Sequence, residues 1–164
     1  MVITGLLVAI IKPKRMGAPD LNKPMQVISM VSMIALPILL WFVSFSINAA
    51  FWIGLIIVVL GQVIFALACV AMREHPEKSA TVVDWGIYRI TRHPHFLSSV
   101  VTGLGAIVMG WTTESAMYII VWIYFMLDLA YTHVAILHEE KRTEEKLGPE
   151  YEAYMTRTLR YFLI

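Results

Sequence analysis

Polar residues that could do chemistry gather in two short stretches of an otherwise apolar chain. The first is Arg92-His93-Pro94-His95-Phe96, within the segment YRITRHPHF. Arginine can bind an anionic group through two parallel hydrogen bonds, and histidine can accept or release a proton near neutral pH. Residue types alone leave two interpretations open. One is a membrane anchor, with arginines on lipid phosphates and histidines at the headgroup level, and the other is a polar pocket for an anionic ligand.

The second stretch, HEEKRTEEK, contains Glu139 and Glu140 and follows an apolar segment. Its acidic and basic residues alternate poorly, so ion pairs along one helix do not explain it. Asp128, eleven residues before Glu139, is the one acidic residue inside an apolar segment. Burying a carboxylate there is costly unless it is paired or hydrated, so we expect Asp128 to have a function. A structural partner such as Tyr88 or a helix-facing threonine is the competing explanation.

Neither a metal site nor a disulfide framework is expected. The H-x-H spacing of His93 and His95 lacks a second ligand cluster at a fixed distance, which a zinc site needs. Cys69 is the single cysteine and lies in an apolar segment, where a small buried hydrophobe is the ordinary interpretation.

The composition indicates an integral membrane protein. Of 164 residues, 59% are hydrophobic and 15% are charged, and the mean hydropathy is +0.70. A soluble domain of this length has no core large enough to hide so much apolar surface. The net charge of +1 gives no reason to expect a nucleic-acid partner, whereas membrane lipids are expected neighbours.

The apolar segments predict an all-α membrane protein with about five transmembrane helices, at residues 1–11, 25–47, 50–72, 97–111 and 115–137. A full crossing needs about 20 residues, a length that the first and fourth segments do not reach. Lysines and arginines fall after the first segment, between the third and fourth, and in the tail. This distribution predicts that the N-terminus is outside and that the basic segments and the active site face the cytoplasm.

The tail predicts a separate helix that closes over the bundle. Gly148 followed by Pro149 is typical of a helix C-terminal cap and the first position of the next helix. That next helix would place Tyr151, Tyr154 and Thr158 on one face, as an amphipathic lid.

Two motifs carry a family resemblance. The segments ATVVDWGIYRITRHPHF and HEEKRTEEKLGPEYEAY resemble the integral-membrane methyltransferases, which include isoprenylcysteine carboxyl methyltransferases and phospholipid N-methyltransferases. Both motifs occur in the family's order and spacing, over about residues 80–162. The resemblance implies one membrane domain over 1–164, with N-terminal helices in 1–79 and a methyltransferase-like half in 80–164. It also implies S-adenosylmethionine as methyl donor, in a cavity that the C-terminal helical tail closes.

The resemblance also implies roles for individual residues. Those that match cofactor-contacting positions of the family are Thr81, Val82, Val83, Tyr88, Arg92, His93, Pro94, Glu139 and Glu140. An amine or thiol acceptor would have to lose a proton before it attacks the methyl group. The candidates for accepting that proton are His93, His95 and Asp128.

Three departures from the family pattern bear on the methyl acceptor. Phe96 replaces a tyrosine, Ser98 stands where many members have glycine, and Ala135 stands where the prenylcysteine enzymes have a substrate-contacting arginine. We therefore predict a lipophilic acceptor with an amine, such as a lipid head group. The alternatives are an isoprenylcysteine carboxyl O-methyltransferase, an NADPH-dependent membrane reductase with a similar R-H-P region, and a non-enzymatic lipid-binding subunit.

Overall fold

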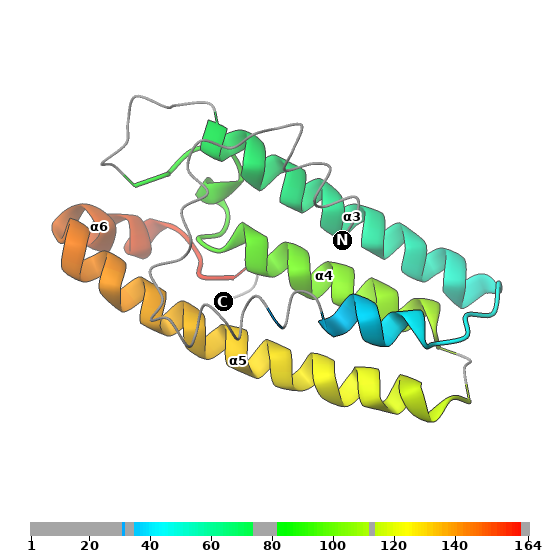
Figure 1. Ribbon diagram of the computed structural model, residues 1–164. Helices are drawn as coiled ribbons and strands as arrows, with labels where there is room; N and C mark the ends of the chain where they lie inside the picture. The colour runs from blue at the N-terminus through cyan, green and yellow to red at the C-terminus, as the bar shows by residue number, and fades with distance from the viewer. Residues whose placement is uncertain (1–30, 32–34, 74–81, 112–113, 162–164) are drawn as a thin grey trace.

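The computed structural model describes residues 31, 35–73, 82–111 and 114–161 (Figure 1). Within these ranges all regular elements are helices. Residues 35–41 form a helical stretch that precedes the named elements. A parallel bridge between Thr91 and Leu159 joins two connecting segments. The elements are α3 (Ala49–Arg73), the 3-10 helix η1 (Gly86–Arg89), α4 (Pro94–Met109), α5 (Ala116–Leu147) and α6 (Pro149–Arg157).

Two of the described helices are long and apolar enough to cross a membrane. They cover Ala49–Met72 and Ala116–Leu147, while the apolar helix Pro94–Met109 is shorter. Large apolar side chains stay exposed along both long helices, among them Ile56 on α3 and Ile123 on α5, as lipid-facing surfaces require. The predicted segment 50–72 is confirmed, and the segment 97–111 corresponds to α4. The segment 1–11 and the residues 25–30 and 32–34 of the segment 25–47 lie outside the described residues, so the span count and the orientation stay predictions.

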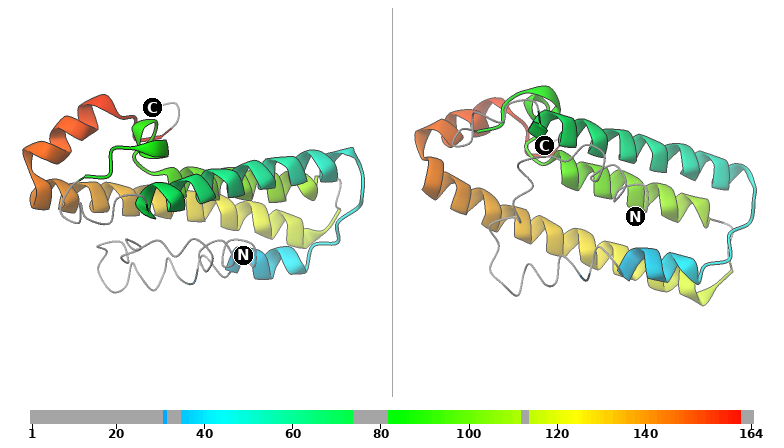
Figure 2. Two further views of the ribbon diagram at one scale, coloured as in Figure 1. Left: turned by 90° about the horizontal axis from the view of Figure 1, so that it is seen from above. Right: turned by 45° about the horizontal axis from the view of Figure 1, so that its top comes forward.

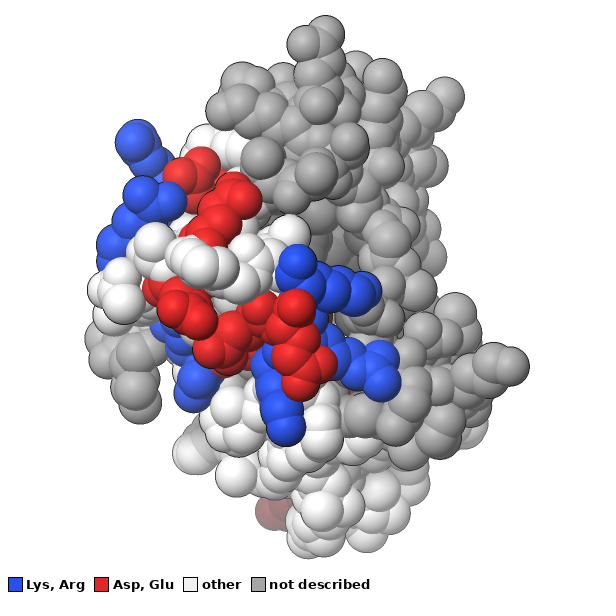
Figure 3. Space-filling view, turned by 90° about the vertical axis from the view of Figure 1, so that its left-hand side faces the viewer, with Lys and Arg blue, Asp and Glu red and all other residues white. Residues whose placement is uncertain are grey.

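Helix α5 ends where the sequence predicts. Its apolar pattern stops near residue 137, and the helix continues through the charged stretch to Leu147, with Gly148 as the C-cap residue. The extension adds the turns that carry Glu139 and Glu140. Its end and the adjacent α6 form the charged end of the bundle, where Figure 3 shows acidic and basic side chains gathered together.

Helices α3 and α4 pack side by side through small residues (Figure 2). A Cβ atom added to Gly54 would lie 2.5 Å from the carbonyl oxygen of Gly105. Two glycines therefore let the backbones approach closely, as is common between membrane helices. Ser98, which departs from the family's glycine, donates a 2.9 Å hydrogen bond to the carbonyl of Gly61 on the facing helix. The serine that replaces the family's glycine therefore contributes to the packing of α4 against α3.

Helices α4 and α5 share a core at the end opposite the charged residues. Ile107, Val121 and Phe125 are buried there together with Val43. The Tyr118 hydroxyl donates a 2.6 Å hydrogen bond to the carbonyl of Ile107, which fixes the start of α5 against the end of α4.

The predicted C-terminal helix is confirmed, but it ends at Arg157, and Thr158, which the sequence placed on its face, is the buried C-cap residue. Gly148 has a positive φ of 54°, Pro149 begins α6, and Tyr151 and Tyr154 are buried on the same face. We call residues 158–161 the C-terminal segment. It runs beside the residues that precede α4: Arg92 N donates to Leu159 O at 2.9 Å, and the Thr91 hydroxyl donates to Arg160 O at 3.0 Å. The lid is therefore joined to the segment that carries Arg92 and His93.

Candidate active site

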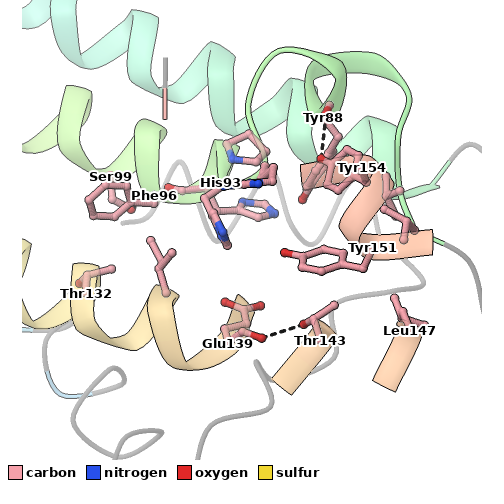
Figure 4. A pocket seen from close by; sticks show the side chains of 16 residues that line it. Tyr88, His93, Phe96, Ser99, Thr132, Glu139, Thr143, Leu147, Tyr151 and Tyr154 are labelled. Carbon is pink, nitrogen blue, oxygen red and sulfur yellow. Dashed lines mark hydrogen bonds between the residues drawn. The ribbon is translucent and has the colours of Figure 1, made fainter. Parts of the chain in front are cut away.

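A cavity of about 480 Å³ lies at the charged end of the bundle (Figure 4). Its volume falls within the usual range for small-molecule sites. Its wall comes from α4, α5, α6 and the segment before α4. The lining residues are Val82, Val83, Tyr88, Arg92, His93, Pro94, His95, Phe96, Ser99, Thr132, Ile136, Glu139, Thr143, Leu147, Tyr151 and Tyr154.

Helical spacing explains why these side chains meet. Pro94 occupies the first turn of α4, so His93 is the N-cap residue just outside the helix. On α5 the lining residues recur every three or four positions, which places them on one face. They are Thr132, Ile136, Glu139, Thr143 and Leu147.

Glu140 lies behind the cavity wall and is held by three basic side chains. It is 4% exposed. Arg160 places Nε and Nη2 each 2.8 Å from its Oε2, and His93 Nε2 lies 3.1 Å from its Oε1. Arg92 Nε is also 3.1 Å from Oε1. A buried carboxylate needs such partners, because an unpaired charge is expensive to desolvate. We call Glu140, Arg92, His93 and Arg160 the Glu140 cluster.

The Arg92 guanidinium is occupied by contacts within the protein. Its Nη1 donates a 3.0 Å hydrogen bond to the carbonyl of Met155 in α6. Its Nε contacts Glu140 as an ion pair without hydrogen-bond geometry. Although Arg92 borders the cavity, its charge is balanced by Glu140, and it joins α6 to the residues that precede α4.

Glu139, the neighbour of Glu140, faces the cavity instead. Figure 4 shows its side chain on the cavity side of α5, opposite His93. Its main-chain oxygen accepts a 2.8 Å hydrogen bond from the Thr143 hydroxyl one turn later. Successive residues on a helix point about 100° apart, so Glu139 faces the cavity while Glu140 faces the basic side chains behind its wall. The cavity wall therefore presents the carboxylate of Glu139.

Tyrosines supply neutral hydrogen-bond donors to the cavity. Burial raises the pKa of Tyr151 to about 12 and raises the pKa values of Tyr88 and Tyr154 well above their ordinary value. All three phenols are therefore protonated at neutral pH. The Tyr154 hydroxyl donates to the carbonyl of Tyr88 at 2.8 Å, whereas the Tyr151 hydroxyl points into the cavity in Figure 4.

His95 is an apolar-packed histidine in the same wall. Its ring lies edge-on to Phe65, with ring centroids 5.2 Å apart. Neither ring nitrogen has a hydrogen-bond partner within the part of the chain that the structure describes. Unpartnered buried nitrogens are uncommon, so the two nitrogens of His95 stand out among the described residues of the wall.

The structure brings most of the residues predicted for the site around this one cavity. Val82, Val83, Tyr88, Arg92, His93, Pro94, His95 and Glu139 line it. Glu140 lies behind the wall, and Asp128 lies on α5 outside the lining residues. Thr81 lies outside the described residues.

Sequence reasoning missed several contributors. Arg160 holds Glu140, yet in the sequence it is one of several tail arginines and carries no distinguishing signal. Ser99 and Thr132 were also missed, although each lies at helical spacing from a predicted residue: Ser99 four residues after His95, and Thr132 seven residues before Glu139. Tyr151 and Tyr154 could have been assigned to the cavity, because their shared buried face was expected.

Comparisons with known proteins place the chain in a family. Residues 24–158 match the model of a family described as "Protein of unknown function (DUF1295)". Two proteins from Oryza sativa, one from subspecies indica and one from japonica, are each named probable protein-S-isoprenylcysteine O-methyltransferase. Each is 30% identical to this chain over 124 residues, which are 70% of this chain and 58% of the relative. The chain therefore spans little more than half the length of these relatives.

No solved structure matches the chain. The family match and the two relatives agree with the resemblance seen in the two motifs, and the two long apolar helices agree with a membrane protein. The chain belongs to the DUF1295 family and, with it, to the superfamily of membrane methyltransferase-like proteins.

Proposed function

We propose that this protein is a membrane-embedded methyltransferase that moves a methyl group from S-adenosylmethionine to a lipophilic acceptor. The observation that carries the proposal is the composition of the cavity wall. A carboxylate, two histidines and tyrosine hydroxyls line it together with apolar residues of α4 and α5, whose outer faces are exposed and apolar.

The lining residues fit the methyl donor. S-adenosylmethionine carries a sulfonium, an ammonium and a carboxylate beside ribose and adenine, and it supplies an electrophilic methyl group when bound. Glu139 can accept hydrogen bonds from the ammonium or the ribose hydroxyls, and its charge favours a cationic ligand. Tyr151 can donate from its hydroxyl. Val82 and Val83 offer apolar surface for adenine, and Val82 N is joined to α6 by a 3.4 Å contact with Glu150.

Positioning and exclusion of water are the protein's main contributions to such a reaction. Methyl transfer gains most when the nucleophile is held about 3 Å from the methyl carbon in a dry site. The lid helix α6 covers the cavity with Tyr151 and Tyr154, both buried. Joining α6 to the segment before α4 through Arg92 keeps this cover in place.

The lipophilic acceptor is expected to occupy the side of the cavity formed by the membrane helices. Phe96 and Ser99 of α4 face Thr132 and Ile136 of α5 there. An acceptor that enters between these helices can leave its apolar chain in the bilayer. We place the reacting group near His93 and His95, the candidates for accepting a proton, and away from Asp128, which is not in the wall.

Charge in the cavity favours an amine acceptor, such as a lipid head group, over a carboxylate. Among the described lining residues, Arg92 is the one arginine or lysine, and its guanidinium already contacts Glu140 and Met155. Ala135 is 6% exposed and lies outside the wall, and its methyl side chain supplies no cation. The Glu139 carboxylate would repel an acceptor carboxylate and attract an ammonium.

Titration calorimetry on the full chain in detergent tests the proposal. We expect saturable binding of S-adenosylmethionine and of its demethylated product, and no binding of NADPH. Donor carrying a tritiated methyl group, incubated with the lipid that copurifies with the protein, should then label that lipid. Binding of NADPH alone would support a reductase, and binding of neither ligand would support a non-enzymatic subunit.

A further inference from the structure

The Glu140 cluster constrains the protonation of His93. Two arginines contact the Glu140 carboxylate, and arginine stays charged at any pH that the protein meets. Their charges stabilise the ionised carboxylate, which can only accept hydrogen bonds. His93 Nε2 lies 3.1 Å from Oε1 of this carboxylate. The hydrogen-bond network therefore assigns the ring proton of neutral His93 to Nε2.

The other ring nitrogen then carries a lone pair. In a neutral imidazole one nitrogen is the donor and the other the acceptor, and their directions diverge. Because Nε2 points at Glu140 behind the wall, Nδ1 points away from it. Within the described ranges Nδ1 has no hydrogen bond, and the His93 side chain, 12% exposed, lines the cavity. Nδ1 is thus the nitrogen that a cavity ligand can reach.

We propose that Glu140 is a positioning residue that holds His93 as the Nε2–H tautomer, and that His93 Nδ1 accepts the proton of an ammonium acceptor in the cavity. The inference rests on the proposed function and specifies its acceptor as a protonated amine. It also changes the role of Glu140, which the sequence resemblance placed among the cofactor contacts.

His93, the ammonium acceptor and the methyl donor together account for every proton and electron pair in the reaction. His93 Nδ1 takes one proton from the ammonium, which leaves a neutral amine with a lone pair. That lone pair forms the new N–CH₃ bond while the S–CH₃ bond breaks and its electron pair stays on sulfur. The positive charge of the sulfonium passes to the methylated nitrogen, and the imidazolium of His93 later releases its proton to water.

Charged groups of three parts of the chain surround His93. Glu139 and Glu140 lie on α5, and Arg92 precedes His93 directly in the chain. Arg160 of the C-terminal segment lies on the other oxygen of Glu140.

Nitrogen-15 NMR of histidine-labelled full-length protein in detergent reads the tautomer directly. His93 is assigned from the signal that disappears in His93→Asn. We expect neutral His93 of the wild type to be mainly Nε2–H, and Glu140→Gln to lose this preference. Glu145→Gln, an exposed change five residues along the same helix, should leave the tautomer unchanged. A dominant Nδ1–H signal in the wild type overturns the proposal, even where Glu140→Gln does not fold.

Kinetics on the same samples separate this inference from the proposed function. Loss of a carboxylate that orients a functional histidine typically costs about 10–100-fold, so Glu140→Gln should lower kcat by that factor with the donor Kd unchanged. Absence of donor binding in the wild type would refute the methyltransferase proposal. Donor binding together with an unaltered tautomer in folded Glu140→Gln would refute the positioning role alone.

Discussion

Replacing Arg160 by alanine removes one of the contacts that hold the C-terminal segment to α5; another joins the Tyr161 hydroxyl to His133 Nδ1 at 2.6 Å and remains. Arg160 is the one residue of this segment whose side chain reaches Glu140, through Nε and Nη2 at 2.8 Å. The backbone of the segment also accepts hydrogen bonds from Arg92 N and the Thr91 hydroxyl. Without the arginine the segment retains these bonds, so we expect it to open more often without the whole protein unfolding.

The cost follows from burial and from the remaining partners. Removing one partner of a fully buried ion pair costs about 3–5 kcal/mol, and a hydrogen bond to a charged group contributes about 1.5–3 kcal/mol. The Arg160 side chain is 37% exposed, and Glu140 keeps His93 and Arg92 as partners. We therefore expect Arg160→Ala to lower the free energy of opening the C-terminal segment by about 2 kcal/mol, within the lower of the two ranges. This corresponds to a roughly 30-fold larger equilibrium constant for opening.

Hydrogen exchange measured by mass spectrometry tests this value. The amides of Arg92 and Thr158, bonded to Leu159 O and Tyr154 O, should exchange about 30-fold faster in Arg160→Ala. Arg157→Ala is the matched control, since Arg157 pairs with Asp84 at 2.9 Å but is 61% exposed. Surface pairs contribute at most about 1 kcal/mol, so this control should change exchange by less than about fivefold. Equal effects of the two variants would refute the special role assigned to Arg160.

Three further predictions concern packing and the cavity. Gly105→Val should lower the thermal midpoint by several degrees, because its Cβ would lie 2.6 Å from the Val58 amide nitrogen; an unchanged midpoint contradicts the close packing of α3 and α4. Ser98→Ala should destabilise the protein by about 1 kcal/mol in a denaturation series, through loss of its bond to Gly61 O. Ser99→Trp should fill the α4 side of the cavity and reduce methyl transfer more than tenfold while calorimetry shows unchanged donor binding; equally reduced donor binding would contradict separate acceptor and donor regions.

Local signals in the sequence predicted the elements well. Pro94 and the Gly148-Pro149 pair act on the backbone next to them, so the start of α4 and the junction of α5 and α6 could be predicted without knowledge of the tertiary fold. The hydropathy of α3 predicted its extent in the same way. The end of α5 followed from the Gly148 cap and not from hydropathy, because hydropathy reports where a helix leaves the apolar phase, not where its backbone hydrogen bonds end.

The sequence could not show that Glu139 faces the cavity while Glu140 binds the basic side chains behind it. The two residues are adjacent, and the residues that decide their surroundings lie far away in the chain, His93 before α4 and Arg160 after α6. For Asp128 the sequence predicted the helix face correctly but not the position along the helix. Its eleven-residue separation from Glu139 preserves the helix face but spans about 16 Å along the axis, which takes it beyond the residues that line the cavity.

Binding of S-adenosylmethionine to the wild type, Glu139→Gln and Glu145→Gln tests the central claim most directly. Glu139 lines the cavity, whereas Glu145 is exposed on the same helix. Each charge-assisted hydrogen bond contributes about 1.5–3 kcal/mol, so calorimetry should show a donor Kd at least tenfold weaker in Glu139→Gln and unchanged in Glu145→Gln. Equal affinities in all three proteins, or no binding in any of them, would contradict a donor site in this cavity.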